Sequence, residues 1–463
     1  MKFFTVATAL VAGAILSSAT PSTASSPKEP TLIHIPIEKR GSSLTRANSG
    51  KADFGKIASH LGHLRTKYQK NLVNFQINTG KEHPLRIAIP NWKRGVNGTG
   101  SVELEDVQEN LWVGTLAYGT PPQSIKVDFD TGSADTLVNS GAYHPRASST
   151  SVRTKKTFQT AYGDGTAAEG TVYTDVLTIG DLKAPKTAIG LSSSGAYHPR
   201  ASSTSVRTKK TFQTAYGDGT AAEGTVYTDV LTIGDLKAPK TAIGLSSSRF
   251  INPNKEGGNQ GISGMSFPSL ATFGHSHPPF FDSLHNAGAL SAFQFAFKID
   301  SSGSHLYLGG HNPSDITGWP SWVSVDSNGG FWQVPATADG YGSFESIVDT
   351  GTTLIVAPVD AARGYFHSIG VETRDYNGSL FGAYNCKKPP TVSFTYGAKK
   401  ITLGAEAISV GTDDDGSCIL SVVGQDTGID AWITGDALLR NTVAIFDRTN
   451  RRVGFATRSG GSK

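Results

Sequence analysis

Apolar and polar residues alternate over short stretches along most of the chain. In the sequence SIKVDFD, Ile125, Val127 and Phe129 alternate with polar or charged neighbours, which predicts a half-buried β-strand. A comparable apolar stretch, Ile347 and Val348, precedes a turn far downstream. The 463 residues include 53 Gly and 22 Pro, and only 17% are charged, which favours short strands joined by turns. We therefore expect an all-β protein that is long enough for two lobes, each with its own core.

The first 24 residues have the pattern of an export signal. Lys2 is followed by an apolar run and then by small residues, with cleavage expected near Ala24. The run is too short for a membrane anchor, and no later apolar stretch in the sequence is long enough to cross a bilayer. We expect residues 1–24 to be a signal peptide and the mature protein to be secreted and extracellular, with no membrane partner.

The segment that follows the signal differs in charge from the rest of the chain. Residues 26–94 hold 13 Lys and Arg against 4 Asp and Glu, a net charge of +9, whereas residues 95–463 hold 28 basic and 34 acidic residues, a net charge of −6. A basic arm for nucleic acid is one interpretation. A propeptide is the better one, because the segment lies between the signal and the dibasic pair of Lys93 and Arg94. We therefore expect residues 25–94 to be a cleaved propeptide and nucleic acid not to be a partner.

One 54-residue segment occurs twice without a single difference, as residues 141–194 and again as residues 195–248. Each copy holds TFQTAY, a glycine-rich turn GDG and the alternating stretch GTVYTDVLTI, the pattern of a β-hairpin. Two copies are too few for a solenoid. Identity even at solvent-facing positions indicates a recent duplication or an error in assembling the gene. We favour the interpretation that one copy is superfluous.

Two turns with the sequence Asp-Thr-Gly-[Ser/Thr] each follow an apolar strand, one in each half of the chain. They present Asp130 and Asp349 where a strand enters a glycine turn. Two carboxylates held close together share a proton, so one can act as a general base on water while the other protonates a carbonyl oxygen. The chemistry needs nearby hydroxyls and an unhindered backbone, which are offered by Ser133, Thr352, Gly132 and Gly351. The pattern predicts peptide hydrolysis with no cofactor and no metal.

These motifs resemble those of the pepsin-like (family A1) aspartic proteases of the secreted, fungal type, the family in which such a shared proton is best known. The resemblance covers nearly everything after residue 94: VQENLWVGTLAYGTPPQ, both DTG turns, the sequence at Gly261 to Gly264 and DAWITGDALLRNTVAIFDRTNRRVGFA. It implies an all-β, bilobal fold with the active-site cleft between two similar lobes, residues 95–300 and 301–463. It also implies an acid-active endopeptidase that is made as a zymogen, binds extended polypeptides and its own propeptide, and is a monomer. Thr131 and Thr350 would brace the two catalytic loops against each other.

The resemblance assigns the repeated hairpin to the flap that closes over the cleft. The tip residues are Tyr162, Gly163 and Asp164 in the first copy, or Tyr216, Gly217 and Asp218 in the second. Only one hairpin fits over the cleft. Tyr162 lies 32 residues after Asp130, whereas Tyr216 lies 86 residues after it, and the shorter interval suits a short crossover and a hairpin. We therefore favour Tyr162, although the chain has three options: the first copy, the second, or a hybrid of the two.

Other residues refine this picture. Cys386 and Cys418 are the two cysteines, and export favours a disulfide between them over two free thiols. Asn97 and Asn377 begin glycosylation sequons. The sequence departs from the resembled family at Leu137, where a tryptophan that supports the flap is usual, and at Ser263, where an aliphatic residue is usual.

Two other functions compete with the protease. The first is a catalytically impaired peptide-binding protein on the same fold, which the duplicated flap and Leu137 favour and the intact Asp130 and Asp349 oppose. The second is a carbohydrate or cell-wall binding module, for which tryptophans such as Trp319, Trp322 and Trp332 would have to form a platform. Structural burial explains such tryptophans equally well.

Overall fold

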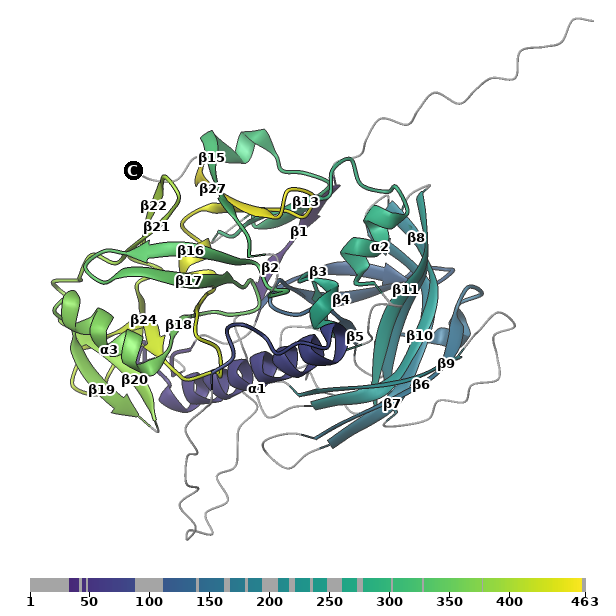
Figure 1. Cartoon of the computed structure of the whole chain (residues 1–463), viewed down its shortest axis with the longest axis horizontal. Helices are drawn as coiled ribbons and strands as arrows, with labels where there is room; N and C mark the ends of the chain where they lie inside the picture. The colour runs from purple at the N-terminus through teal and green to yellow at the C-terminus, as the bar shows by residue number, and fades with distance from the viewer. Residues whose placement is uncertain are drawn as a thin grey trace, which may run out of the picture. The chain divides into compact units, whose positions relative to one another are not determined.

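The computed structural model describes residues 33–40, 44–46, 49–87, 111–138, 141–161, 167–179, 182–193, 207–215, 221–233, 236–247, 260–272, 278–300, 303–326, 329–376 and 378–459. These residues belong to one compact unit, residues 31–463. Most of them lie in strands, with few helices, as the alternating pattern predicts (Figure 1). No helix in the described part of the chain is long and apolar enough to cross a membrane.

The DTG turn that begins at Asp130 lies in an 11-stranded sheet. The order of its strands is β10-β9-β6-β7-β8-β11-β5-β12-β4-β3-β2. Its strands outside the repeat are β2 (Glu38–Arg40), β3 (Leu111–Tyr118), β4 (Gln123–Asp130), β5 (Thr136–Val138) and β12 (Gly261–Gly264). The alternation predicted for β4 is confirmed, because Ile125, Val127 and Phe129 are fully buried. Strand β12 runs parallel to β4 and antiparallel to β5, so it crosses directly behind the turn that follows β4.

The second turn lies in a 10-stranded sheet with the same local arrangement. The strands are β16 (Gln333–Ala338), β17 (Gly342–Val348), β18 (Ile355–Ala357), β19 (Glu372–Tyr376), β20 (Ser379–Tyr384), β21 (Ser393–Tyr396), β22 (Lys399–Thr402), β23 (Ser409–Thr412), β24 (Cys418–Gly424) and β25 (Trp432–Thr434). Strand β25 runs parallel to β17 and antiparallel to β18, as β12 does to β4 and β5. Each DTG turn is therefore held between the strand that leads into it and a strand that crosses behind it.

A six-stranded sheet takes strands from both halves of the chain, in the order β1-β14-β13-β26-β27-β15. These strands are β1 (Ile33–Pro36), β13 (Gln294–Lys298), β14 (His305–Leu308), β15 (Ile316–Ser324), β26 (Val443–Asp447) and β27 (Arg452–Arg458). The core beneath them contains Phe295, Trp332 and Phe446, whose rings contact one another. The sheet joins the residues on either side of the expected lobe boundary at 300/301.

The longest helix, α1 (Phe54–Thr79), has 26 residues and lies in the segment expected to be a propeptide. Asp53 caps its first turn by accepting a hydrogen bond from the backbone N–H of Lys56, and Gly80 ends it in the left-handed conformation with φ of 71°. Its buried side recurs at helical spacing, at Ile57, Leu61, Leu64, Tyr68, Leu72 and Phe75. The helix is not among the predicted elements, although that spacing is visible in the sequence. The other helices are short: α2 (Phe280–Asn286), α3 (Val359–Ser368) and α4 (Asp436–Leu439).

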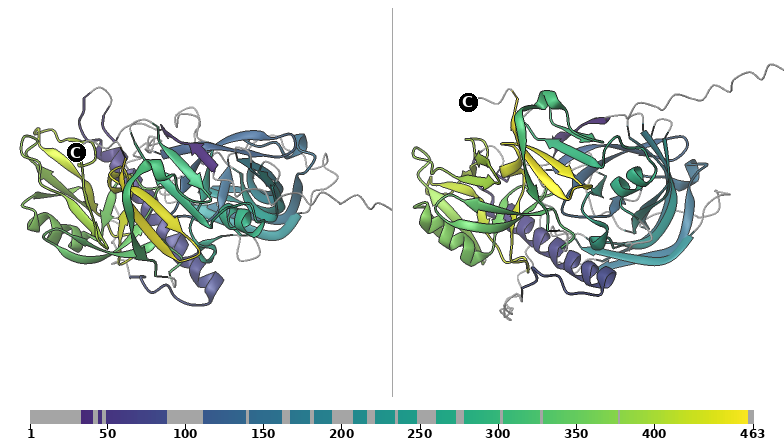
Figure 2. Two further views of the ribbon diagram at one scale, coloured as in Figure 1. Left: turned by 90° about the horizontal axis from the view of Figure 1, so that it is seen from above. Right: turned by 45° about the horizontal axis from the view of Figure 1, so that its top comes forward.

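Both copies of the repeat form strands in the 11-stranded sheet, seen as the blue and teal strands in Figure 2. The first copy supplies β6 (Val152–Ala161), β7 (Ala167–Ile179) and β8 (Leu182–Ser193), and the second supplies β9 (Arg207–Ala215), β10 (Ala221–Ile233) and β11 (Leu236–Ser247). The hairpin predicted for each copy is present, since β6 pairs with β7 and β9 pairs with β10.

Strand β8 of the first copy and strand β11 of the second copy pair with β5 in the same register. Leu137 is opposite both Gly190 of β8 and Gly244 of β11, and these glycines are 54 positions apart. The other edge of β5 is already paired with β12. A strand has only two edges, so β8 and β11 are alternative occupants of the remaining one.

Candidate active site

The two DTG turns place Asp130 and Asp349 face to face. Asp130 ends β4 and is 4% exposed, and Asp349 follows β17 and is fully buried. Each carboxylate accepts a hydrogen bond from the backbone two residues on, from Gly132 N–H at 2.8 Å and from Gly351 N–H at 3.0 Å. A Cβ atom on Gly132 would lie 2.5 Å from Asp349 Oδ1. The glycines are therefore required because each turn approaches the carboxylate of the other.

The threonines of the two turns exchange hydrogen bonds. Thr131 donates its backbone N–H to Thr350 Oγ1 at 3.0 Å, and Thr350 donates its backbone N–H to Thr131 Oγ1 at 2.9 Å. Their hydroxyls in turn donate to the carbonyls of Val348 and Phe129, at 2.9 Å and 2.6 Å. All four groups are buried, so this arrangement has the geometry expected for a brace between the two loops.

The hydroxyls that follow the glycines differ in their contacts. Thr352 Oγ1 donates to Asp349 Oδ2 at 2.6 Å, as expected for a residue that orients the carboxylate. Ser133 Oγ is buried and makes no hydrogen bond within the described part of the chain. The loop of Asp130 is supported instead by the backbone, because Met265 N–H donates to Asp130 O and Ser266 N–H donates to Ser133 O, both at 2.8 Å.

Helix α1 brings a lysine between the two carboxylates. Lys67 Nζ lies 2.7 Å from Asp130 Oδ1 and 3.0 Å from Asp349 Oδ2. The next residue, Tyr68, donates its hydroxyl to Asp349 Oδ2 at 3.0 Å, and Asn71 Nδ2 donates to the carbonyl of Gly132 at 2.7 Å. The opposite net charges of residues 26–94 and 95–463 predicted a propeptide, but no sequence pattern singled out these three residues. The helical spacing that places Tyr68 on the buried side of α1 was the available signal.

The helix fills the space next to the two carboxylates. The cavity that remains beside Asp130 has a volume of about 30 Å³ and is lined by residues that include Lys67, Lys70, Asn71 and Ser133. Such a cavity holds about one water molecule. An extended peptide therefore has no room beside Asp130 while α1 is in place.

Burial and the lysine set the protonation of the pair. Burial raises the pKa of Asp130 to about 6, against the opposing effect of Lys67. Burial also acts to raise the pKa of Asp349, but Lys67 and the hydrogen bonds from Asp130 and Thr352 outweigh it and hold that pKa below its usual value. For Lys67, burial is outweighed by the two carboxylates, which raise its pKa. The pair thus carries one proton more readily than two or none, with Lys67 as its counter-ion.

The two departures from the resembled family lie side by side behind the first turn. Ser263 of β12 is opposite Thr136 of β5, and their hydroxyls are 3.0 Å apart in a buried hydrogen bond. The buried hydroxyl of Ser263 therefore has a hydrogen-bond partner in the hydroxyl of Thr136. Leu137, in the expected tryptophan position, is 2% exposed and belongs to the hydrophobic core.

The outcome for the remaining predicted residues is mixed. The disulfide between Cys386 and Cys418 is present, with a sequence separation of 32 residues. Both flap tips, Tyr162 to Asp164 and Tyr216 to Asp218, lie outside the described residues, as do Asn97, Asn377, the signal peptide and the dibasic pair. Trp332 is buried in the core and Trp319 is exposed, so these two tryptophans form no common platform.

Comparison with known proteins identifies the family. The family model described as eukaryotic aspartyl protease matches residues 111–196 and 190–458, and the chain belongs to this family. It is 35% identical over 435 residues to "Secreted aspartyl protease 1" of Malassezia globosa, which covers 93% of this chain and 94% of the relative.

More distant relatives agree with this assignment. The chain is 28% identical over 467 residues to "Aspartic protease" of Phaffia rhodozyma, covering 97% of each, and 28% identical over 371 residues to "Pepsin A" of Sus scrofa, covering 77% of this chain and 84% of the relative. The predicted pepsin-like family, fold class and enzyme class, an aspartic-type endopeptidase, are confirmed.

Proposed function

We propose that the protein is a secreted endopeptidase that hydrolyses peptide bonds at acid pH and is made as an inactive precursor. The observation that carries this proposal is the contact of Lys67 with both buried carboxylates, Asp130 and Asp349. The name of the Malassezia globosa relative supports secretion. Extended polypeptides are the proposed substrates, because the space that α1 occupies beside the carboxylates is the space a substrate strand would need.

The proposed chemistry uses a water molecule between the two carboxylates after Lys67 has left. The ionised carboxylate removes a proton from the water, whose oxygen attacks the carbonyl carbon of the peptide bond. The protonated carboxylate gives its proton to the carbonyl oxygen as the tetrahedral intermediate forms. The hydrogen bonds from Gly132 N–H, Gly351 N–H and Thr352 Oγ1 hold the carboxylates in place throughout, and the threonine exchange fixes the distance between them.

Residues 25–94 are the proposed propeptide of this precursor. Helix α1 neutralises the pair of carboxylates with Lys67 and occupies the substrate space, so the precursor can neither bind a peptide nor ionise a water there. Cleavage after Arg94, by a dibasic-specific protease or by the enzyme itself, would make release permanent.

The repeated hairpin is the proposed flap, and one copy is sufficient for it. Two observations support a single working copy: β8 and β11 pair with β5 in the same register, and Ser148 and His144 of the first copy are hydrogen-bonded to Thr120 and Gln123 outside the repeat. Asp175 of the first copy is buried and accepts hydrogen bonds from Tyr143 and Thr150, next to the turn at Gly119. We therefore keep Tyr162 as the flap tyrosine, with Tyr216 as the alternative.

Hydrolysis of an unstructured protein by the purified secreted protein tests the proposed function. We expect cleavage at acid pH that a statine-type transition-state mimic blocks, because such a mimic places a hydroxyl between the two carboxylates. A protein that binds the mimic but cleaves nothing after its N-terminal segment has been removed would instead be a peptide-binding protein. The intact mass and N-terminus of the same material test the repeat and the cleavage after Arg94.

A further inference from the structure

The described residues just before α1, 44–46 and 49–53, pair with each other as the two arms of a hairpin that we call the basic hairpin. Asp53 N–H donates to Leu44 O at 2.8 Å and Arg46 N–H donates to Lys51 O at 2.7 Å, while Thr45 is bridged to Ala52. The hairpin presents two basic side chains, and its Leu44 side chain is only 3% exposed.

The basic hairpin is bound through its backbone to the end of β23, just before the loop that joins β23 to β24. Ala52 N–H donates to Thr412 O at 2.7 Å, and Thr412 N–H donates to Gly50 O at 3.1 Å. A Cβ atom on Gly411, whose φ is +115°, would lie 2.7 Å from Gly50 O and 2.8 Å from Ala52 N. The glycine therefore permits a backbone approach of the kind by which a sheet edge accepts an added strand.

A carboxylate on the same loop receives both basic side chains. Lys51 Nζ lies 2.9 Å from Asp414 Oδ1, and Arg46 Nη1 lies 3.3 Å from the same oxygen. The neighbouring carboxylates of Asp413 and Asp415 form ion pairs with Arg374, at 2.6 Å and 2.7 Å. These ion pairs stabilise the loop and direct both carboxylates toward Arg374 and away from the basic hairpin. The Asp414 side chain is 65% exposed, so these ion pairs contribute selectivity for a basic partner more than strength.

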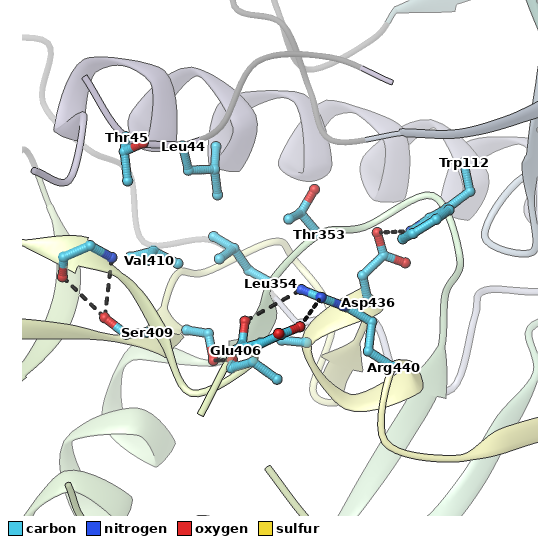
Figure 3. Close-up of a pocket in the computed structure, with 14 residues that line it drawn as sticks. Leu44, Thr45, Trp112, Thr353, Leu354, Glu406, Ser409, Val410, Asp436 and Arg440 are labelled. Carbon is cyan, nitrogen blue, oxygen red and sulfur yellow. Dashed lines mark hydrogen bonds and ion pairs between the residues drawn. The ribbon is translucent and has the colours of Figure 1, made fainter. Parts of the chain in front are cut away.

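The base of the hairpin forms one wall of an adjoining pocket. Figure 3 shows Leu44 and Thr45 on one side of this pocket and the ion pair of Arg440 with Glu406 on the other. Its volume is about 180 Å³, and Val410 and Gly411 also line it. Removal of the basic hairpin would open this pocket on the side of Leu44 and Thr45, and would leave the backbone groups of Thr412 and the carboxylate of Asp414 without their present partners.

The basic hairpin lies well away from the catalytic pair. Lys67 is 13 residues into α1 after Phe54, and at about 1.5 Å per residue this separates the two contacts by about 20 Å along the helix. A ligand at Asp414 would therefore not compete with a short peptide at Asp130 and Asp349.

We propose that Thr412, Asp414 and the adjoining pocket form an exosite that binds a basic hairpin loop on protein substrates once residues 25–94 have been removed. This proposal rests on the proposed function, because it requires the N-terminal segment to be released. The ligand it fits is a hairpin loop with an apolar side chain at its base and two basic side chains that converge on one carboxylate. The chain's own basic hairpin is the template for that chemistry.

Binding of a defined probe to the processed enzyme tests the exosite. The probe is a fluorescent cyclic peptide with the sequence of residues 44–53, added to enzyme whose catalytic pair is occupied by a statine-type inhibitor. We expect saturable binding that weakens about three- to tenfold in Asp414→Asn, the range that two exposed ion pairs supply, and weakens further with salt. The matched control is Asp360→Asn, which removes an exposed carboxylate from α3 of the same lobe and should leave probe binding unchanged.

Two results would overturn the exosite. One is equal affinity of the probe for Asp414→Asn and the unaltered enzyme, and the other is binding of the probe only to enzyme without the inhibitor, which would place the probe in the cleft. Hydrolysis of a short uncharged peptide, measured alongside, should be the same in Asp414→Asn and the parent. Hydrolysis without probe binding rejects the exosite alone, whereas probe binding without any hydrolysis rejects the proposed function alone.

Discussion

Thr131 and Thr350 each donate a backbone N–H to the hydroxyl of the other, at 3.0 Å and 2.9 Å, although they are 219 residues apart in the chain. Each hydroxyl also donates to a carbonyl at the end of the opposite strand, so four buried polar groups depend on two oxygen atoms. This exchange therefore connects the two loops that carry Asp130 and Asp349.

Valine has nearly the shape of threonine but lacks its hydroxyl. Replacing Thr131 by valine should therefore weaken the connection between the loops of Asp130 and Asp349 without changing the packing. The change leaves Thr350 N–H and Val348 O buried without their partner, and we expect a loss of about 1–3 kcal/mol in the free energy of unfolding. Activity should fall further than stability at temperatures where the protein is still folded. Thr131→Ser keeps the hydroxyl and is the matched control, to be compared by thermal unfolding and by kcat. Equal kcat in the valine and serine variants would show that the exchange does not position the carboxylates.

The pH dependence expected for conversion of the proposed precursor follows from the shifted pKa values of the two buried carboxyl groups. The pKa of Asp130 is raised to about 6, so its contribution to stability is present at low pH and lost as pH rises through 6, and its protonation does not open the precursor. The pKa of Asp349 is lowered, so its ion pair with Lys67 stabilises the precursor above its ordinary pKa of about 4 and is lost only as pH falls below that value. We expect conversion to accelerate below about pH 4, measured as loss of residues 25–94 by gel or mass spectrometry.

Lys67→Met should shift this profile. Without the cation, the two carboxylates lose the contact that tethers α1, and we expect faster conversion at higher pH than in the parent chain. Lys81→Met, at an exposed position beyond the end of α1, is the control and should follow the parent profile. A Lys67→Met precursor that keeps the parent profile would remove Lys67 from the account of inhibition.

A chain with a single copy of the repeat should be fully functional. Deleting residues 141–194 or 195–248 yields the same 409-residue sequence, so the experiment needs only one altered gene. We expect secretion and kcat at least equal to those of the full chain, because one occupant of β5 remains. Loss of activity in the single-copy protein would show that the second copy has a function. In the full chain, Tyr162→Phe should reduce activity more than Tyr216→Phe, and the reverse order would assign the flap to the second copy.

Removing the disulfide should destabilise the lobe that contains Asp349. Cys386 and Cys418 close a loop across 32 residues, and a cross-link of this span contributes about 2–4 kcal/mol. We expect the double change Cys386→Ser with Cys418→Ser to lower Tm without changing kcat at low temperature, since neither residue contacts the catalytic pair in the described structure. An unchanged Tm would mean that the pairing of β20 with β24 holds this region together without the cross-link.

The sequence was sufficient to predict the strand-rich fold, the two turns and the disulfide, because each depends on local patterns. Ile125, Val127 and Phe129 alternate, and Asp130 and Asp349 stand in repeated motifs. Lys67 could not be selected in the same way, since its partners lie 63 and 282 residues away and only the packing of α1 on both loops brings it to them.

The contacts of Ser133 and the pairing of the two repeat copies with β5 could also be recognised only from the packed structure. Both turns have a hydroxyl after the glycine, yet only Thr352 contacts its carboxylate in the described structure. The hairpin pattern of the repeat was visible in sequence, whereas the single register on β5 for which β8 and β11 compete required the arrangement of the sheet.

The central claim is that Asp130 and Asp349 together hydrolyse peptide bonds. The most direct measurement is the rate of hydrolysis of an unstructured protein at acid pH by processed Asp130→Asn and Asp349→Asn enzymes, with Asp360→Asn as the control and folding checked by thermal unfolding. We predict that each of the first two changes lowers kcat by at least about a thousandfold, because neither carboxylate can replace the other as base and acid, and that the control retains full activity. Folded Asp130→Asn or Asp349→Asn enzyme with activity close to that of the parent would contradict the account.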